Sequence, residues 1–324
     1  MIEYTASSLY IKGSVLWLDA VTKKELSFVS HVDKLFVPHT RIIATKETIA
    51  YYKKFFLKNE PLNALQMSFF RKFSIGGLTI SLYPSGYSYG AAQILVKKDN
   101  KKILYSGSIN NRQLYYCDEI YYPSADILIM ESVYGMKKYN FSGYKQEEER
   151  LKNYVNFELK KGNNVAIFIS PFEKPQYLIK IFNEFKNPIY LQSKIYQYIN
   201  HLKDYIKDLR TVRAFVTSIK KPSIILYPES LYQKFPIKEN TKKIMVTGRA
   251  IEPEKLKSRY NLDETFVISA HADFNSLVQY AELVNPTKIY LMPSENGNEE
   301  LADTLRNKKF IVDIFSKPIP KKLF

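Results

Sequence analysis

The stretch Ser14–Thr48, SVLWLDAVTKKELSFVSHVDKLFVPHTRIIATKET, decides the expected fold. Three short apolar runs with strand composition alternate with polar connectors, and a helix is expected to begin at about residue 46. Asp19 ends the first of these strands, and the pair Ser30-His31 ends the second. Carboxylate and imidazole groups at strand ends are typical of enzymes that bind metal ions there. The loop after His31 offers few further ligands, so the stretch indicates a fold more strongly than a metal centre.

Length and composition are those of a globular protein. The chain has 324 residues, enough for one large domain or two smaller ones, and 45% of its residues are hydrophobic and 25% charged. No apolar run approaches the roughly 18 to 20 residues that span a bilayer, and the N-terminal segment lacks a secretion signal pattern. A single cysteine, Cys117, excludes an intrachain disulfide and a cysteine-based zinc cluster. We therefore expect a cytoplasmic protein with no membrane partner.

The charge is strongly basic, with 48 Lys and Arg against 32 Asp and Glu and a formal net charge of +16. Such an excess suits polyanions, nucleic acid first and anionic membranes second. The alternative is a general lysine-rich composition without a binding role. The 26 Tyr and 20 Phe include candidates for stacking on unpaired bases, although most lie at apolar-periodic positions expected in the core.

The rest of the chain reads as mixed α/β. A helix is expected over 46–57, strands over 65–109 with the turn KKDNKK between two of them, a buried strand over 126–135 and a helix over 147–162. Further on, short apolar strands alternate with helices, as in a parallel sheet covered on both faces. The motifs GxGxxG, GxxxxGK[ST], HExxH, GxSxG and CxxC are absent, which disfavours phosphate-loop and serine-hydrolase chemistry.

Eight segments in order resemble motifs of the β-CASP nucleases of the metallo-β-lactamase superfamily, a family that processes RNA 3′ ends or trims DNA. They are LWLDA ending at Asp19, Ser30–Phe36, Pro84–Ala91, Tyr105–Ser108, Glu131–Gly135, Lys161–Val165 with Pro175-Gln176, Ser269–Asp273 and Met292–Glu295. The resemblance implies an α/β fold, a four-layer αββα metallo-β-lactamase sandwich formed by residues 1–150 and 246–324. It also implies an inserted α/β cap, residues 151–245, with a cleft between the two domains.

The family's two-zinc site draws on about five histidines plus aspartates, whereas this chain has four histidines in all: His31, His39, His201 and His271. The family motif continues after His31 with further ligands. A gapless alignment replaces its second histidine by Asp33, its aspartate by Leu35 and its last histidine by Phe36. An alignment with a two-residue gap retains Asp33 and puts Lys34 at the last histidine. Elsewhere a family histidine is replaced by Tyr87, the bridging aspartate by Ser108 and the last histidine by Pro293. We therefore expect no zinc and no other cofactor.

The resemblance also assigns roles to the remaining positions. Lys34, Tyr87 and Ser108 replace metal ligands in the cleft and are candidates for binding; the Lys34 ammonium would mimic the metal's charge or attract a phosphate, unless it is a solvated loop lysine. The remnant catalytic positions, for which no catalysis is expected, are Asp19, His31, Asp33, Glu131, His271 and Asp273. We expect them to hold loops through hydrogen bonds, with Glu131 and Asp273 capping helices or pairing with arginine. A weak one-metal site at Asp19, His31, Asp33 and His271 stays open.

These observations predict a catalytically inactive β-CASP homologue, a pseudoenzyme of RNA processing or DNA repair. It would bind nucleic acid, DNA or RNA, through a basic cleft, or bind a nucleic-acid-processing partner such as an active nuclease paralogue. One alternative is a metal-dependent nuclease with a reduced one-metal site. Another is a structural subunit of a nucleic-acid-processing complex, whose positive charge is incidental.

Overall fold

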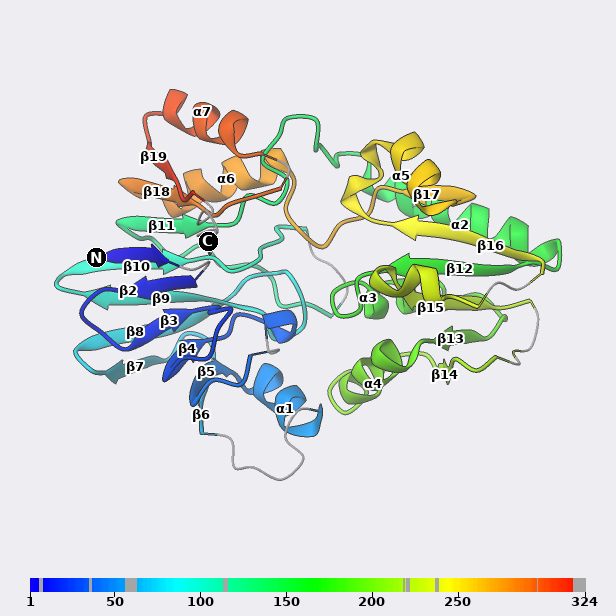
Figure 1. Cartoon of the computed structure of the whole chain (residues 1–324), viewed down its shortest axis with the longest axis horizontal. Coiled ribbons are helices and arrows are strands. Elements are labelled where there is room, and N and C mark those ends of the chain that lie inside the picture. Colours follow the sequence, from blue (N-terminus) through cyan, green and yellow to red (C-terminus); the bar gives the residue numbers. More distant parts are fainter. Residues whose placement is uncertain are drawn as a thin grey trace, which may run out of the picture. The chain divides into compact units, whose positions relative to one another are not determined.

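The protein forms two compact units in a computed structural model (Figure 1). We call Met1–Lys137 with His271–Phe324 the sandwich unit and Lys138–Ala270 the inserted unit. The residues described are 1–5, 8–34, 37–55, 63–112, 116–217, 219, 222–236, 239–295 and 297–316. Leu35 and Phe36, which the gapless alignment places at ligand positions, lie outside them. In the described residues, no helix has both the length and the apolar character needed to cross a membrane.

In its described residues, the sandwich unit contains two sheets and three α-helices. Its elements are β1 (Ile2–Thr5), β2 (Ser8–Ile11), β3 (Leu16–Leu18), β4 (Leu26–Phe28), the 3₁₀ turn η1 (Val32–Lys34), β5 (Arg41–Thr45), α1 (Lys46–Phe55), β6 (Ala64–Met67), β7 (Lys72–Ile75), β8 (Leu78–Pro84), β9 (Ala92–Lys98), β10 (Lys101–Tyr105), β11 (Ile127–Met130), α6 (Phe274–Val284), β18 (Lys288–Leu291), α7 (Glu299–Asn307) and β19 (Ile311–Ile314). The first sheet has the order β1-β2-β3-β4-β5-β6 and the second β19-β18-β11-β10-β9-β8-β7.

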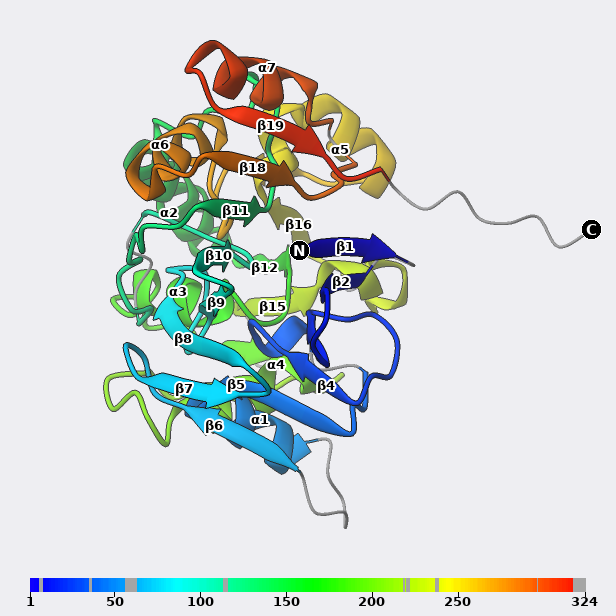
Figure 2. The same cartoon turned by 90° about the vertical axis from the view of Figure 1, so that its left-hand side faces the viewer.

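These elements stack in four layers, which confirms the predicted αββα arrangement. One core joins the two sheets, where residues such as Phe28, Ile80 and Ile103 alternate with outward-facing neighbours and are wholly buried. A second core joins the other face of the second sheet to α6 and α7. Figure 2 shows α7 beside β19 and α1 beside β5 and β6, consistent with their direct contacts.

The predicted hairpin turn KKDNKK is confirmed. Strands β9 and β10 pair antiparallel with Lys98 opposite Lys101, and the two residues between them, Asp99 and Asn100, have φ values of 47° and 59°. Two consecutive left-handed residues match the right-handed twist of a two-residue hairpin, and Asp and Asn tolerate that conformation. The turn therefore follows directly from its sequence.

The inserted unit is a fully parallel sheet with helices around it. Its elements are α2 (Tyr144–Lys160), β12 (Asn164–Ile169), α3 (Pro175–Ile181), β13 (Ile189–Leu191), α4 (Ser193–Leu202), β14 (Arg213–Ala214), β15 (Ile224–Pro228), η2 (Glu229–Lys234), β16 (Thr241–Val246), η3 (Gly248–Ile251), α5 (Pro253–Tyr260) and β17 (Glu264–Phe266). The strand order is β14-β13-β15-β12-β16-β17. Strand β12 is buried along its whole length, as expected for a central parallel strand.

The boundaries predicted at 150 and 245 differ from the limits of these units. Helix α2 runs through residue 150 and contacts β12, so it belongs wholly to the inserted unit. At the other end, β17 pairs with β16 in parallel register, with Phe266 opposite Val246. The sheet therefore continues about twenty residues beyond the predicted limit, to Phe266, and the inserted unit ends at Ala270.

Candidate functional site

Asp19 and Ser30 meet because β3 and β4 are neighbouring parallel strands, so their carboxyl ends lie together. The Asp19 carboxylate accepts hydrogen bonds from the Ser30 amide (2.8 Å), the Ser30 hydroxyl (2.5 Å) and the Tyr105 hydroxyl (2.9 Å). Gly107, with φ of +57°, permits this approach, since a Cβ there would lie 2.8 Å from the Ser30 Cβ. Both carboxylate oxygens are thus engaged within the protein.

His31 is held by the same network. Its Nδ1 lies 2.8 Å from the Ser30 hydroxyl oxygen. Because that hydroxyl donates its one proton to Asp19, we infer that His31 donates through Nδ1 and keeps its lone pair on Nε2. Burial lowers the pKa of His31 well below its usual value, and the positive charge of Lys34 and the proximity of His271 add to this effect. His31 is therefore a neutral, buried imidazole at neutral pH.

The loop between β8 and β9 packs Tyr87 against two histidines. The Tyr87 ring centroid is 4.7 Å from that of His31 and 4.7 Å from that of His271, at interplanar angles of 64° and 51°. Its side chain is 4% exposed. Gly86 shapes this loop with φ of +72°, where a Cβ would lie 2.0 Å from the Asn110 carbonyl oxygen. The phenol ring thus packs against both imidazoles.

Glu131 fixes the second histidine. The His271 Nδ1 lies 2.6 Å from one Glu131 carboxylate oxygen, and the Ile109 amide donates to the other at 2.5 Å. Glu131 follows β11, and His271 precedes α6. The carboxylate therefore orients His271 from one side while Tyr87 contacts its ring from another.

Asp273 has a different environment from Glu131. One carboxylate oxygen accepts the Ser276 amide proton at 2.9 Å and caps the N-terminus of α6, and the other lies 2.5 Å from the Arg112 guanidinium. An N-cap and an ion pair account for this buried carboxylate without a ligand.

The structure gathers Asp19, His31, Tyr87, Glu131 and His271 into one chain of contacts, which we call the histidine-tyrosine cluster. Lys34 donates its amide to the His31 carbonyl oxygen (3.0 Å) within η1, and its side chain is exposed. Asp33 and Ser108 are half-buried. Across the described part of the chain, no group of three or more His, Cys, Asp and Glu side chains is arranged to hold a metal ion.

Sequence reasoning missed Tyr105 and Arg112. Tyr105 ends an apolar strand, so its position predicted only a core residue, yet its hydroxyl binds Asp19. Burial and the nearby Asp19 carboxylate raise the pKa of Tyr105 well above its usual value, so it is a permanent donor. The only available signal was its place directly before the Ser-Gly-Ser motif.

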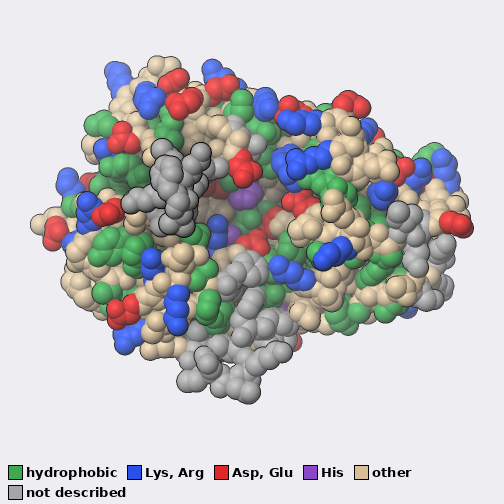
Figure 3. Space-filling model, in the orientation of Figure 1, with side chains coloured by type: hydrophobic (Ala, Val, Ile, Leu, Met, Phe, Trp, Pro, Cys, Tyr) green, Lys and Arg blue, Asp and Glu red, His purple; other side chains and the backbone are tan. Residues whose placement is uncertain are grey.

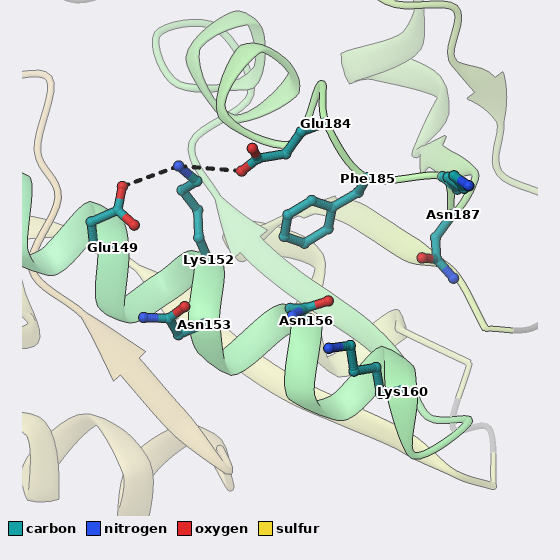
Figure 4. A pocket seen from close by; sticks show the side chains of 9 residues that line it. Glu149, Lys152, Asn153, Asn156, Lys160, Glu184, Phe185 and Asn187 are labelled. Carbon is teal, nitrogen blue, oxygen red and sulfur yellow. Dashed lines mark hydrogen bonds and ion pairs between the residues drawn. The ribbon is translucent and has the colours of Figure 1, made fainter.

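The inserted unit carries a separate hollow of about 600 Å³ between α2 and the segment after α3. Lys152 spans one end through ion pairs with Glu149 (3.0 Å) and Glu184 (3.3 Å), and the Phe185 ring is directed toward α2 (Figure 4). Its other lining residues are Asn153, Asn156, Lys160, Lys186 and Asn187. None of the residues predicted from the motifs lines it.

The basic excess does not gather in one patch on the face that Figure 3 shows. Lys and Arg side chains lie on both units among Asp and Glu. The positive charge of the chain is thus widely distributed on this face.

The four-layer sandwich, the parallel-sheet insertion and the sequence relatives confirm the resemblance to the β-CASP family of the metallo-β-lactamase superfamily. No protein-family model matches the chain. A solved structure described as a protein of unknown function from Enterococcus faecalis V583 has the same fold, with a TM-score of 0.56, 14% identity and coverage of 90% of this chain and 79% of that one.

Three curated relatives carry names from nucleic-acid processing. The chain is 24% identical to a probable DNA ligase of Opitutus terrae over 93% of its own length and 30% of that protein's. It is 26% identical to an RNase J-like protein of Methanocaldococcus jannaschii, covering 67% and 64% of the two lengths. It is 24% identical to the endoribonuclease ysh1 of Schizosaccharomyces pombe, covering 75% and 40%. The chain thus spans between about a third and two thirds of each relative's length.

Proposed function

We propose that this protein is a catalytically inactive β-CASP homologue that binds nucleic acid and that its ancestral metal site no longer holds zinc. The observation that carries the proposal is the packing of the Tyr87 ring against both His31 and His271, with a centroid distance of 4.7 Å to each. A phenol thus packs against both imidazoles, at the position where the resemblance to the family places a histidine ligand.

The donor chemistry supports the absence of a two-metal centre. A dication needs several anionic or imidazole donors to replace its water shell. Here hydrogen bonds from Ser30 and Tyr105 occupy the Asp19 carboxylate, and the Nδ1 atoms of both histidines are engaged, so each histidine could offer at most its Nε2 atom to a metal ion. The Tyr87 phenol adds neither a carboxylate nor an imidazole to this donor set. The residues present do not fit a two-zinc centre, so we derive no metal-dependent step.

Charge and relatives support the nucleic-acid part of the proposal. The net charge of +16 favours a polyanionic ligand, and the relatives' names include a DNA ligase and two ribonucleases. Lys34 is the last residue of η1, which begins directly after His31. Its exposed ammonium would be offered to a phosphate. A processing enzyme as partner belongs to the same proposal, because the chain matches only 30% of the longer ligase.

The test is a titration of labelled single-stranded DNA and RNA, measured by fluorescence anisotropy between about 50 and 200 mM salt. We expect a steep loss of affinity with salt and no cleavage when Zn²⁺, Mn²⁺ or Mg²⁺ is added. Lys34→Gln should weaken binding to all sequences and flatten the logarithmic salt slope by about 0.7, the value for one lost phosphate contact.

Lys101→Gln is the matched control. Lys101 is also exposed, but it lies at the start of β10. The opposite end of that strand carries Tyr105, which contacts Asp19, so Lys101 is at the end of β10 away from the histidine-tyrosine cluster. Equal effects of the two substitutions would show that Lys34 has no special role. No binding at low salt would overturn the function, and metal-dependent cleavage abolished by His31→Gln would establish the one-metal nuclease instead.

A further inference from the structure

Three aromatic rings cluster on the sandwich unit outside its cores. The rings of Tyr83 and Tyr121 stack at 5.2 Å and 11°, and Phe70 meets both edge-on, at 5.5 Å and 5.2 Å. Phe70 is 56% exposed and Tyr121 47% exposed. Large rings are normally buried by the fold, so three of them gathered at the surface indicate a binding surface.

Phe70 also has an unusual backbone. Its φ is +65°, a left-handed conformation that is rare for a bulky residue. The Phe70 amide donates to the Leu82 carbonyl oxygen (2.9 Å), and Phe69 forms a β-bridge with Leu82, so the conformation is fixed by β8. Backbone strain of this kind concentrates at functional sites. At Phe70, the residue with the strained backbone carries a ring that is more than half exposed.

The cluster is attached to the loop that carries Tyr87. The Tyr121 amide donates to the Pro84 carbonyl oxygen (3.1 Å), and the buried Gln93 side chain donates to the carbonyl oxygens of Pro84 (2.8 Å) and Tyr121 (2.6 Å). Pro84 ends β8 and begins that loop. Tyr83 and Tyr87 are four residues apart, so their Cα atoms lie within about 14 Å.

We propose that Phe70, Tyr83 and Tyr121 form a stacking platform for unpaired bases of a single-stranded nucleic acid. This proposal rests on the proposed nucleic-acid binding and names the form of the polymer. Every base has a π-face, so such a platform binds single strands with little regard to sequence, whereas paired bases in a duplex are shielded. DNA and RNA present the same faces.

The charges beside the platform fit a supporting role for the backbone phosphates. Arg71 and Lys72 follow Phe70 and are exposed, and Arg71 has no ion-pair partner among the residues that the structure describes. Asp118 and Glu119 precede Tyr121 along the chain. With both signs present, stacking rather than phosphate attraction should carry the affinity of this surface.

The experiment compares Phe70→Ala and Tyr121→Ala with wild type on single-stranded DNA, single-stranded RNA and a DNA duplex. Phe157→Ala is the control, because Phe157 is 55% exposed but lies on α2 of the inserted unit. We expect single-strand dissociation constants to rise about five-fold or more in both platform variants, the low end for loss of one base-stacking partner. The salt slope should stay unchanged, and the control should stay within about two-fold. The DNA and RNA arms show which polymer is preferred.

Phe70→Gly guards against a folding artefact. Glycine adopts positive φ without strain, so Phe70→Gly should melt at or above the temperature of Phe70→Ala, while single-strand binding falls equally in the two variants. Wild-type affinity in the Phe70 variants overturns the platform and leaves nucleic-acid binding intact. Equal losses on duplex and single strand also overturn it. If wild type binds no nucleic acid, the proposed function and the platform fail together.

Discussion

Asp19 shows how a single residue in this cluster is stabilised. Its carboxylate is almost fully buried and would be costly to desolvate without partners. Two donors from Ser30 and one from Tyr105 replace its water. The backbone of Asp19 has φ of 44°, a conformation that aspartate tolerates better than most residues. This combination gives Asp19 a structural role that needs no bound ion.

At the same scale, His31 should make stability depend on pH. Its folded-state pKa is lowered by burial, then by Lys34 and His271, while the unfolded chain titrates near pH 6.5. Below pH 6.5 the unfolded state binds a proton that the folded state does not. Stability should therefore be complete above about pH 6.5 and decline as the pH falls, by up to about 1.4 kcal/mol per pH unit.

Denaturant unfolding of wild type and His31→Gln between about pH 7.5 and 5 measures this dependence. The variant should lose the His31 share of the slope. His39→Gln is the comparison variant: burial also lowers the pKa of His39, but the Asp19 carboxylate opposes this, so the His39 share of the slope should be smaller than that of His31. Identical slopes in wild type and His31→Gln would show that His31 does not titrate differently on unfolding.

At the scale of elements, strands were the most predictable part of the fold. Short apolar runs, such as those before Asp19 and around Ile127, predict strands, because they are too short for a helix and are bounded by turn residues. Helix α5 was missed, since it is polar and its only fully buried side chain is Leu256. The start of α2 at Tyr144 was also missed, because Gly143 provides no side-chain cap. Such boundaries depend on tertiary contacts.

The candidate site was predictable as a set of residues but not as a geometry. Motif order identified Asp19, His31, Tyr87 and His271. The packing of the Tyr87 ring against both histidines joins segments more than fifty residues apart, and no local pattern encodes such contacts. The exposed platform was hidden for the same reason: Phe70 and Tyr121 look like ordinary core aromatics in the sequence.

Lys152 provides a test at the element scale. It joins α2 to the segment after α3 through Glu149 and Glu184, and hydrogen bonding to Glu149 raises its pKa, with Glu184 adding to the effect. Both carboxylates are largely exposed, so solvent screens the pairs. Lys152→Met should lower the free energy of unfolding by about 0.5 kcal/mol at low salt.

The Lys152 difference should vanish near 1 M NaCl, where the screening length is only about 3 Å. Lys160→Met is the control, because Lys160 lies on the same helix and lines the same hollow. It should show little change, since no carboxylate among the described residues lies within ion-pair distance of Lys160. A loss at Lys152 that persists in high salt would point to packing of the lysine stem instead.

At the scale of the whole molecule, one chain with a formal net charge of +16 folds into two compact units, each with its own core. The sandwich unit holds the histidine-tyrosine cluster and the aromatic platform, and the inserted unit holds a parallel sheet and the hollow beside α2. The relatives extend beyond the matched region, since the chain covers 30% of the ligase and 40% of the endoribonuclease.

The most direct test of the central claim is the metal content of the purified protein. The protein is incubated with excess Zn²⁺ or Mn²⁺, freed of unbound ions by gel filtration and analysed by inductively coupled plasma mass spectrometry. Because Tyr87 packs against both histidines and too few donors remain, we predict less than about 0.2 equivalents of either metal per chain. Retention of one or more equivalents, accompanied by cleavage of single-stranded nucleic acid, would contradict it.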